Sequence, residues 1–151
     1  MRSLSMNTRS ISLIKSTIKN LVAQYNTRDP IQLTRELDIH VIYNELGNIG
    51  GYCFYSNRIR CICVNSSAPK EYIPFIVAHE LGHIFLHPDR NIPYLHHYTY
   101  ANIGKIEREA NTFAVELLVP DNEINFTKCV TLTSLSAEYG IPLNFIHLKQ
   151  F

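Results

Sequence analysis

The feature that most constrains this chain of 151 residues is the motif HELGH at residues 79–83, which lies in an apolar stretch that ends before Pro88. On an α-helix, residues four positions apart lie on one face, so His79 and His83 can point imidazole nitrogens at a single metal ion. Glu80 would stand beside that ion, where its carboxylate can accept a proton from water. The chain contains seven histidines, and an accidental match to the pattern has a probability of roughly 2%. The motif therefore predicts a buried helix with two metal ligands and a general base, rather than surface or core histidines.

A catalytic zinc site takes three protein ligands and keeps a fourth position for water, so a third ligand is needed. Apolar periodicity predicts a second long helix over residues 103–118, on which Glu107 and Asn111 share a face with small alanines. We expect Glu107 to be the third ligand and Asn111 to hydrogen-bond a ligating histidine, whereas Glu109 points away from that face. A solvated surface charge is the alternative for Glu107. His87 is the rival ligand, although a straight helix rarely presents three successive turns to one tetrahedral ion, and a histidine also suits a helix C-terminus.

The remaining patterns predict an α+β domain in which N-terminal helices precede a small antiparallel sheet. β-branched and aromatic runs between turn residues predict the strands, and the last two strands form a hairpin. Residues 91–102, rich in Tyr and His, are expected to form a loop beside the site. In chain order we expect helices at 10–25 and 29–37, strands at 39–43, 50–55 and 59–64, helices at 72–87 and 103–118, and two short helices, one ending at Gly140 and one beginning at Pro142.

Composition limits the classes of function. Fourteen basic and thirteen acidic residues give a net charge of +1, so no broad field predicts direct nucleic-acid or membrane binding. We expect neither a signal peptide nor a membrane span, and hence a cytoplasmic protein with a flexible tail at residues 1–9 and a single domain at 10–151. Four cysteines do not indicate a disulfide scaffold, and Cys61 and Cys63 alternate in a strand, where buried thiols are expected more than metal ligands.

Two sequence blocks carry a family resemblance. AHELGH at 78–83, followed by Leu86-His87, and EREANTFA at 107–114, followed by LLVP at 117–120, resemble the signatures of the ImmA/IrrE family of zinc metallopeptidases. The resemblance implies a zincin-like fold, Zn²⁺ as cofactor and a third zinc ligand at Glu107. It also implies a substrate class, helix-turn-helix repressors of phages or mobile elements. Residues 70–75 depart from the family pattern because they lack an expected arginine.

We therefore expect a zinc-dependent endopeptidase whose protein substrate is a DNA-binding repressor. In this reading Glu80 takes a proton from the attacking water and passes it to the leaving amine, without a covalent intermediate. The substrate would lie extended along the strand at 50–55. Two alternatives remain open: a zinc-containing regulator that binds a repressor or a toxin–antitoxin partner without cleaving it, and a zinc hydrolase of a small molecule. A general base is needed only for the hydrolytic readings.

Overall fold

The computed structural model of the chain describes residues 5–88, 100–122 and 130–150. Within these residues, helices and a small three-stranded sheet form an α+β fold, so the predicted fold class is confirmed. No described helix is both long enough and apolar enough to cross a membrane. The elements in chain order are α1 (Thr8–Tyr25), α2 (Pro30–Glu36), β1 (His40–Asn44), β2 (Gly51–Ser56), β3 (Ile59–Asn65), η1 (Lys70–Tyr72), α3 (Ile73–Leu86), α4 (Tyr100–Leu118), α5 (Leu132–Tyr139) and η3 (Ile146–Leu148).

The sheet has the order β1-β3-β2, with β3 in the centre. β2 and β3 form the predicted antiparallel hairpin, in which Asn57 and Arg58 both have positive φ, as a tight two-residue hairpin turn requires. β1 pairs with β3 in parallel, so the prediction of an antiparallel sheet is wrong for this pair. The chain reverses direction between β1 and β2 and reverses again in the β2–β3 hairpin. β3, which lies between β1 and β2, therefore runs parallel to β1. Strand order therefore makes β2 an edge strand.

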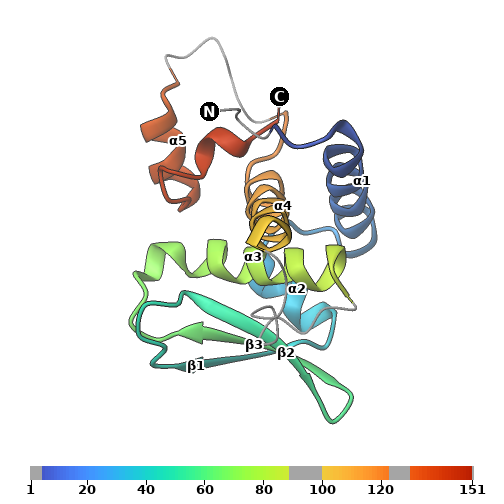
Figure 1. Cartoon of the computed structure of the whole chain (residues 1–151), viewed down its shortest axis with the longest axis vertical. Helices are drawn as coiled ribbons and strands as arrows, with labels where there is room; N and C mark the ends of the chain where they lie inside the picture. The colour runs from blue at the N-terminus through green and yellow to red at the C-terminus, as the bar shows by residue number, and fades with distance from the viewer. Residues whose placement is uncertain (1–4, 89–99, 123–129, 151) are drawn as a thin grey trace.

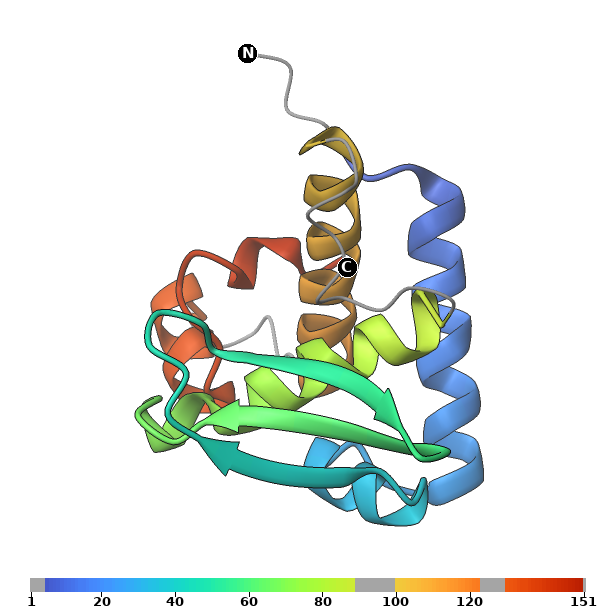
Figure 2. The same cartoon turned by 60° about the horizontal axis from the view of Figure 1, so that its bottom comes forward.

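Helix α3 is covered on two sides. Figures 1 and 2 show the sheet as an outer layer, α3 lying along it, and α4 on the side of α3 away from the sheet. The helices meet closely at Gly82, where an added Cβ would lie 3.0 Å from the Cα of Ala110 and 3.1 Å from the Cβ of Phe113. Glycine removes the side chain that would separate the two axes. This contact brings the faces of α3 and α4 that carry the predicted site together.

Helix boundaries largely follow the predicted signals. Pro74 lies in the first turn of α3, where proline is tolerated, and His87 follows its last residue. Gly140 has φ +63° after α5, as predicted for a helix C-terminus. Three details differ. α1 begins at Thr8 rather than at residue 10, so the last two residues of the expected tail are helical. α4 begins at Tyr100 rather than at residue 103, and the helix expected from Pro142 is a turn followed by the single 3₁₀ turn η3.

Candidate metal centre

The structure brings together the three predicted metal ligands. His79 and His83 lie one turn apart on α3, and Glu107 reaches them from α4. The Nε2 atoms of the histidines are 3.1 Å apart. The Glu107 carboxylate lies 3.2 Å from Nε2 of His79, through Oε2, and 3.0 Å from Nε2 of His83, through Oε1. Among the described residues this is the one group of three or more ligand-type side chains that converges closely enough to hold an ion.

The spacing of these atoms fits a tetrahedral zinc site. Zinc binds imidazole nitrogen and carboxylate oxygen at about 2.0–2.2 Å, so two ligands of a tetrahedral ion lie about 3.3 Å apart. The three separations here are 3.0, 3.1 and 3.2 Å, and all three contacts join ligand atoms of the kind that zinc accepts. A small outward movement of each side chain would suffice to admit the ion. The donor set therefore fits the metal that the sequence predicts.

Asn111 orients the first of these histidines. Its Oδ1 lies 2.8 Å from Nδ1 of His79, so the imidazole donates through Nδ1 and presents Nε2 as the ligand atom. Such a bond fixes both the tautomer and the ring direction of a metal-binding histidine. The contact is the one predicted from the helical face shared by Asn111 and Glu107.

Glu80 is buried beneath the edge strand. Its side chain is 3% exposed, and among the described residues one carboxylate oxygen, Oε2, has no hydrogen-bond partner. The Cys53 thiol of β2 lies close enough to influence the pKa of this carboxylate. Burial raises the pKa of Glu80, and Glu107 adds to the rise, while His79, His83 and Cys53 oppose it. A buried carboxylate with a raised pKa and a free oxygen is suited to receive a proton.

The pKa values of the ligand groups shift in opposite directions. Burial opposes protonation of His79, but the hydrogen bond and charge of Glu107, with the charge of Glu80, raise its pKa overall. Burial likewise favours the neutral form of Glu107, but its bonds to His79 and His83 lower its pKa overall. The Glu107 carboxylate is thus held ionised, and the surroundings of the His79 imidazole favour a positive charge there. A divalent cation satisfies both groups at once.

The rival ligand His87 is engaged elsewhere. Its Nε2 lies 3.3 Å from Oε2 of Glu109, whose Oε1 accepts a hydrogen bond of 2.8 Å from the hydroxyl of Ser10. Glu109 therefore points away from the predicted ligands, and this contact ties the end of α3 to α4 and α1. His87 lies outside the converging group of ligand atoms.

A cavity of about 530 Å³ opens beside these residues. His79, Glu80, Glu107 and Asn111 line it, together with residues 47–51 before and at the start of β2, and with Pro142 and Phe145 near the C-terminus. Neither Pro142 nor Phe145 was predicted to lie at the site. Their apolar character was visible, but nothing local in the sequence placed residues 142–145 near the motif helix.

Two other residues at the site were not assigned a role from the sequence. At Gly51 an added Cβ would lie 2.7 Å from the carbonyl oxygen of Cys63 and 2.9 Å from Ile76, so only glycine lets β2 lie this close to α3 above Glu80. The role of the Cys53 thiol had no signal beyond its place in a strand.

Several expectations concern other residues. Cys53, Cys61 and Cys63 are free thiols, as predicted. The Tyr- and His-rich residues 91–99, which include His96 and His97, lie outside the described residues, as does Cys129.

Comparison with known proteins agrees with this geometry. Residues 34–149 match the sequence profile of the peptidase family M78, described as the IrrE N-terminal-like domain. The chain is 38% identical over 141 residues to "Uncharacterized immunity region protein 2" of Bacillus phage phi105, which covers 91% of the chain and 89% of the relative. It is 25% identical over 133 residues to "Metallopeptidase ImmA" of Bacillus subtilis strain 168, covering 85% and 79%. The chain therefore belongs to the ImmA/IrrE family of metallopeptidase-like proteins, whose fold is zincin-like.

Proposed function

We propose that this protein is a zinc-dependent endopeptidase, in which His79, His83 and Glu107 hold Zn²⁺ and Glu80 is the general base. The observation that carries the proposal is the convergence of the three ligand atoms within 4.8 Å, directly beside a buried carboxylate whose Oε2 has no hydrogen-bond partner among the described residues. Structural zinc sites are closed by four protein ligands, whereas three ligands beside a base are typical of hydrolytic sites. Family membership and the metallopeptidase relative support the same activity.

The residues divide the chemistry among them. His79, His83 and Glu107 would hold the ion, which would polarise the scissile carbonyl and lower the pKa of the attacking water. Glu80 receives the proton of that water at Oε2 and then delivers it to the leaving amine. Asn111 keeps His79 in the tautomer that presents Nε2.

We further propose that the substrate is a DNA-binding repressor of the helix-turn-helix class, cleaved in the cytoplasm. The name of the phage relative places that protein in an immunity region, and the family resemblance implies the same class of substrate. An extended substrate segment would add to the free edge of β2, since edge strands bind peptides through main-chain hydrogen bonds. This placement would carry the scissile bond past Glu80 and the zinc ligands.

The test compares the wild type with Glu80→Gln, both loaded with zinc and incubated with a panel of purified phage helix-turn-helix repressors. We expect the wild type to cleave at least one repressor, as measured by intact-mass spectrometry. Glu80→Gln should keep its zinc but lose cleavage by about 10²–10⁴-fold. If both proteins bind a repressor tightly and neither cleaves it, the non-catalytic regulator is the correct function. Turnover of small esters or amides without any repressor cleavage would instead favour a small-molecule hydrolase.

A further inference from the structure

We propose that the cavity beside the metal ligands is a specificity subsite, which accepts an apolar side chain of the substrate residue that follows the scissile bond. Phe145, from the C-terminal segment, and Ile49, from the loop before β2, form its two walls. This inference rests on the proposed function and adds to it the chemistry of the preferred substrate. Its evidence lies in the residues that line the cavity and in the contacts that hold them there.

The floor of the cavity is apolar next to the ligands. Phe75 and Ile76, on the turn of α3 before His79, both line it, and the Phe75 ring centroid lies 6.5 Å from that of the His79 imidazole. Phe75 is buried at 5% exposure. A side chain placed here would contact carbon atoms while its backbone remains beside the metal ligands, as recognition of an apolar residue requires.

Asn65 fixes the first wall. This buried residue, 5% exposed, donates hydrogen bonds through its side-chain amide to the carbonyl oxygens of Gly47, at 3.0 Å, and Ile49, at 2.8 Å. Its Oδ1 accepts from the backbone amides of Leu46, at 3.4 Å, and Ser67, at 2.9 Å. One side chain therefore sets the path of the loop, and Ile49, which is 59% exposed, stands at the cavity as an apolar group without cover.

The opposite wall comes from the C-terminal segment. The Phe145 ring stacks on the Phe75 ring, with centroids 5.3 Å apart and an interplanar angle of 13°. Pro142 lines the same side of the cavity, and the next residue after Phe145, Ile146, is buried in the core at 1% exposure. The wall is thus a packed continuation of the core rather than a loose chain end.

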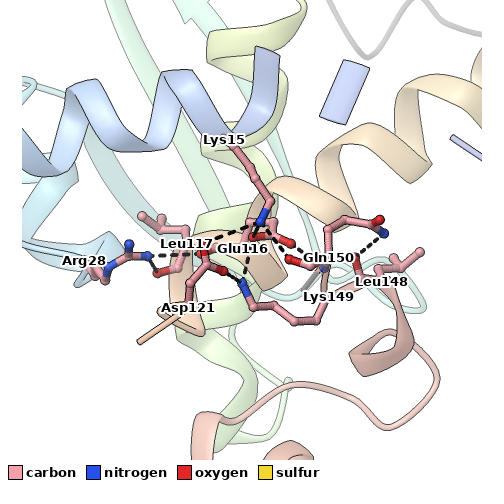
Figure 3. A network of polar contacts seen from close by, with 8 residues as sticks. All are labelled: Lys15, Arg28, Glu116, Leu117, Asp121, Leu148, Lys149 and Gln150. Atoms are coloured by element: carbon pink, nitrogen blue, oxygen red, sulfur yellow. Dashed lines mark hydrogen bonds and ion pairs between the residues drawn. The ribbon is translucent and has the colours of Figure 1, made fainter. Parts of the chain in front are cut away.

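Polar contacts anchor this segment at its far end. Figure 3 shows Lys149 and Gln150 gathered with Lys15 around Glu116 at the end of α4. The Lys149 ammonium donates to Glu116 Oε2 at 2.8 Å and also to Asp121. The backbone amide of Gln150 donates to Glu116 Oε1 at 2.6 Å, and Lys15 donates to the Gln150 carbonyl at 2.7 Å. These bonds fix the segment a few residues beyond Phe145.

Strand direction assigns the subsite to one side of the scissile bond. β2 begins at Gly51, which lines this cavity with Ile76 and Glu80, and its later residue Tyr55 lines a different cavity that extends past His83. Antiparallel pairing is the more stable arrangement per residue. A substrate strand antiparallel to β2 runs from the Tyr55 end towards Gly51, so the residue after the scissile bond faces the cavity with Ile49 and Phe145.

The experiment measures ligand binding rather than turnover. Zinc-loaded protein is titrated calorimetrically with acetohydroxamate, which binds the metal alone, and with hydroxamates whose chain continues as the residue after the scissile bond. Their side chains at that residue are methyl, isobutyl, benzyl or carboxyethyl. We expect isobutyl or benzyl to bind at least about tenfold more tightly than methyl, the discrimination typical of an apolar pocket. Carboxyethyl should bind no better than methyl.

Variants identify the walls. Ile49→Ala and Phe145→Ala should each reduce the ratio of isobutyl to methyl affinity, with zinc content and acetohydroxamate affinity unchanged. Ile49→Ala alters an exposed residue, so it remains informative if Phe145→Ala does not fold. Leu143→Ala, at an exposed position (54%) outside the cavity lining, is the matched control and should keep the wild-type ratio.

Three results would overturn the inference, and they are distinguishable. If zinc and acetohydroxamate bind but the wild type shows no preference for apolar side chains, the subsite is absent while the proposed function stands. If the wild type shows the preference and Ile49→Ala keeps it in full, Ile49 is not a wall of the subsite and the inference as stated is wrong. If neither zinc nor acetohydroxamate binds, the proposed function fails and the subsite fails with it.

Discussion

Two carboxylates on α4, Glu107 and Glu116, have very different surroundings. They are nine positions apart, which places them on opposite faces of the helix. Glu116 is buried at 4% exposure and faces two ammonium groups, Lys149 at 2.8 Å and Lys15 at 3.7 Å. Glu107 is 41% exposed and faces imidazole nitrogens at 3.0 and 3.2 Å. Lysine carries a permanent charge at neutral pH, whereas imidazole can be neutral.

The different surroundings of Glu116 and Glu107 indicate a structural role for the first and a functional role for the second. A buried carboxylate needs a compensating cation, and the chain supplies its own to Glu116. Glu107 is partly exposed and faces imidazoles, whose charge is not fixed, and an imidazole can exchange its proton for a metal ion from solution. We therefore interpret the Glu116 cluster as an anchor of the C-terminal segment and the Glu107 cluster as the place of an exogenous metal ion. Four predictions test this contrast.

Lys149→Met should have the largest effect, because it leaves Glu116 buried without its nearest cation. Removing one partner of a buried ion pair costs about 3–5 kcal/mol of folding free energy. Urea denaturation at pH 7, with zinc in excess, measures the loss. The double variant Lys149→Met/Glu116→Leu is the control, and it should recover much of the stability because no unpaired charge remains. A double variant as unstable as the single one would contradict this account of the cluster.

Glu107→Ala should abolish stoichiometric zinc binding. The loss of a metal ligand should exceed the 10–100-fold cost of removing a ligand's hydrogen-bond partner, so we expect an affinity reduced by more than about 100-fold, or about 2.7 kcal/mol. Competition with a chromogenic chelator measures the affinity. Glu109→Ala is the matched control on the same helix and should retain zinc, since Glu109 contacts His87 and Ser10 instead. Zinc lost only in the Glu109 variant would show that the ligand assignment is wrong.

Asn111→Ala should weaken zinc binding by about tenfold and at most about 100-fold, since it frees the His79 ring to rotate and to exchange tautomers. The same competition assay applies. Asn111→Asp keeps an acceptor oxygen for Nδ1 of His79 and should bind zinc at least as well as the wild type. Equal affinities in all three proteins would show that packing alone positions the imidazole.

Local signals predicted much of this fold and its site. Four-residue spacing placed His79 and His83 on one helical face, and the shared face of Glu107 and Asn111 predicted both of their observed contacts. Such inferences succeed because helical periodicity converts sequence separation into direction without knowledge of the tertiary structure.

Features set by tertiary arrangement were beyond the sequence patterns. The parallel pairing of β1 with β3 depends on strand order, which a pattern of alternating apolar residues does not contain. Phe145 stacks on Phe75, which lies 70 positions earlier in the sequence. Lys149 bonds to Glu116, which lies 33 positions earlier. A single lysine in the sequence is expected to be a surface charge, and only the buried glutamate opposite Lys149 shows otherwise.

Asp121→Asn should have the smallest effect, although Asp121 also pairs with Lys149. The hydrogen bond from Lys149 lowers the pKa of Asp121, but the side chain is 65% exposed, and exposed ion pairs contribute about 0.5 kcal/mol. Because the pKa is lower in the folded state, this contribution is present above the unfolded value of about 3.9 and is lost as the pH falls through the folded value. Denaturation at pH 7 and pH 3 should therefore show a small difference from the wild type that narrows in acid. A loss as large as that of Lys149→Met would mean that solvent exposure does not decide which charges of the cluster hold the C-terminal segment.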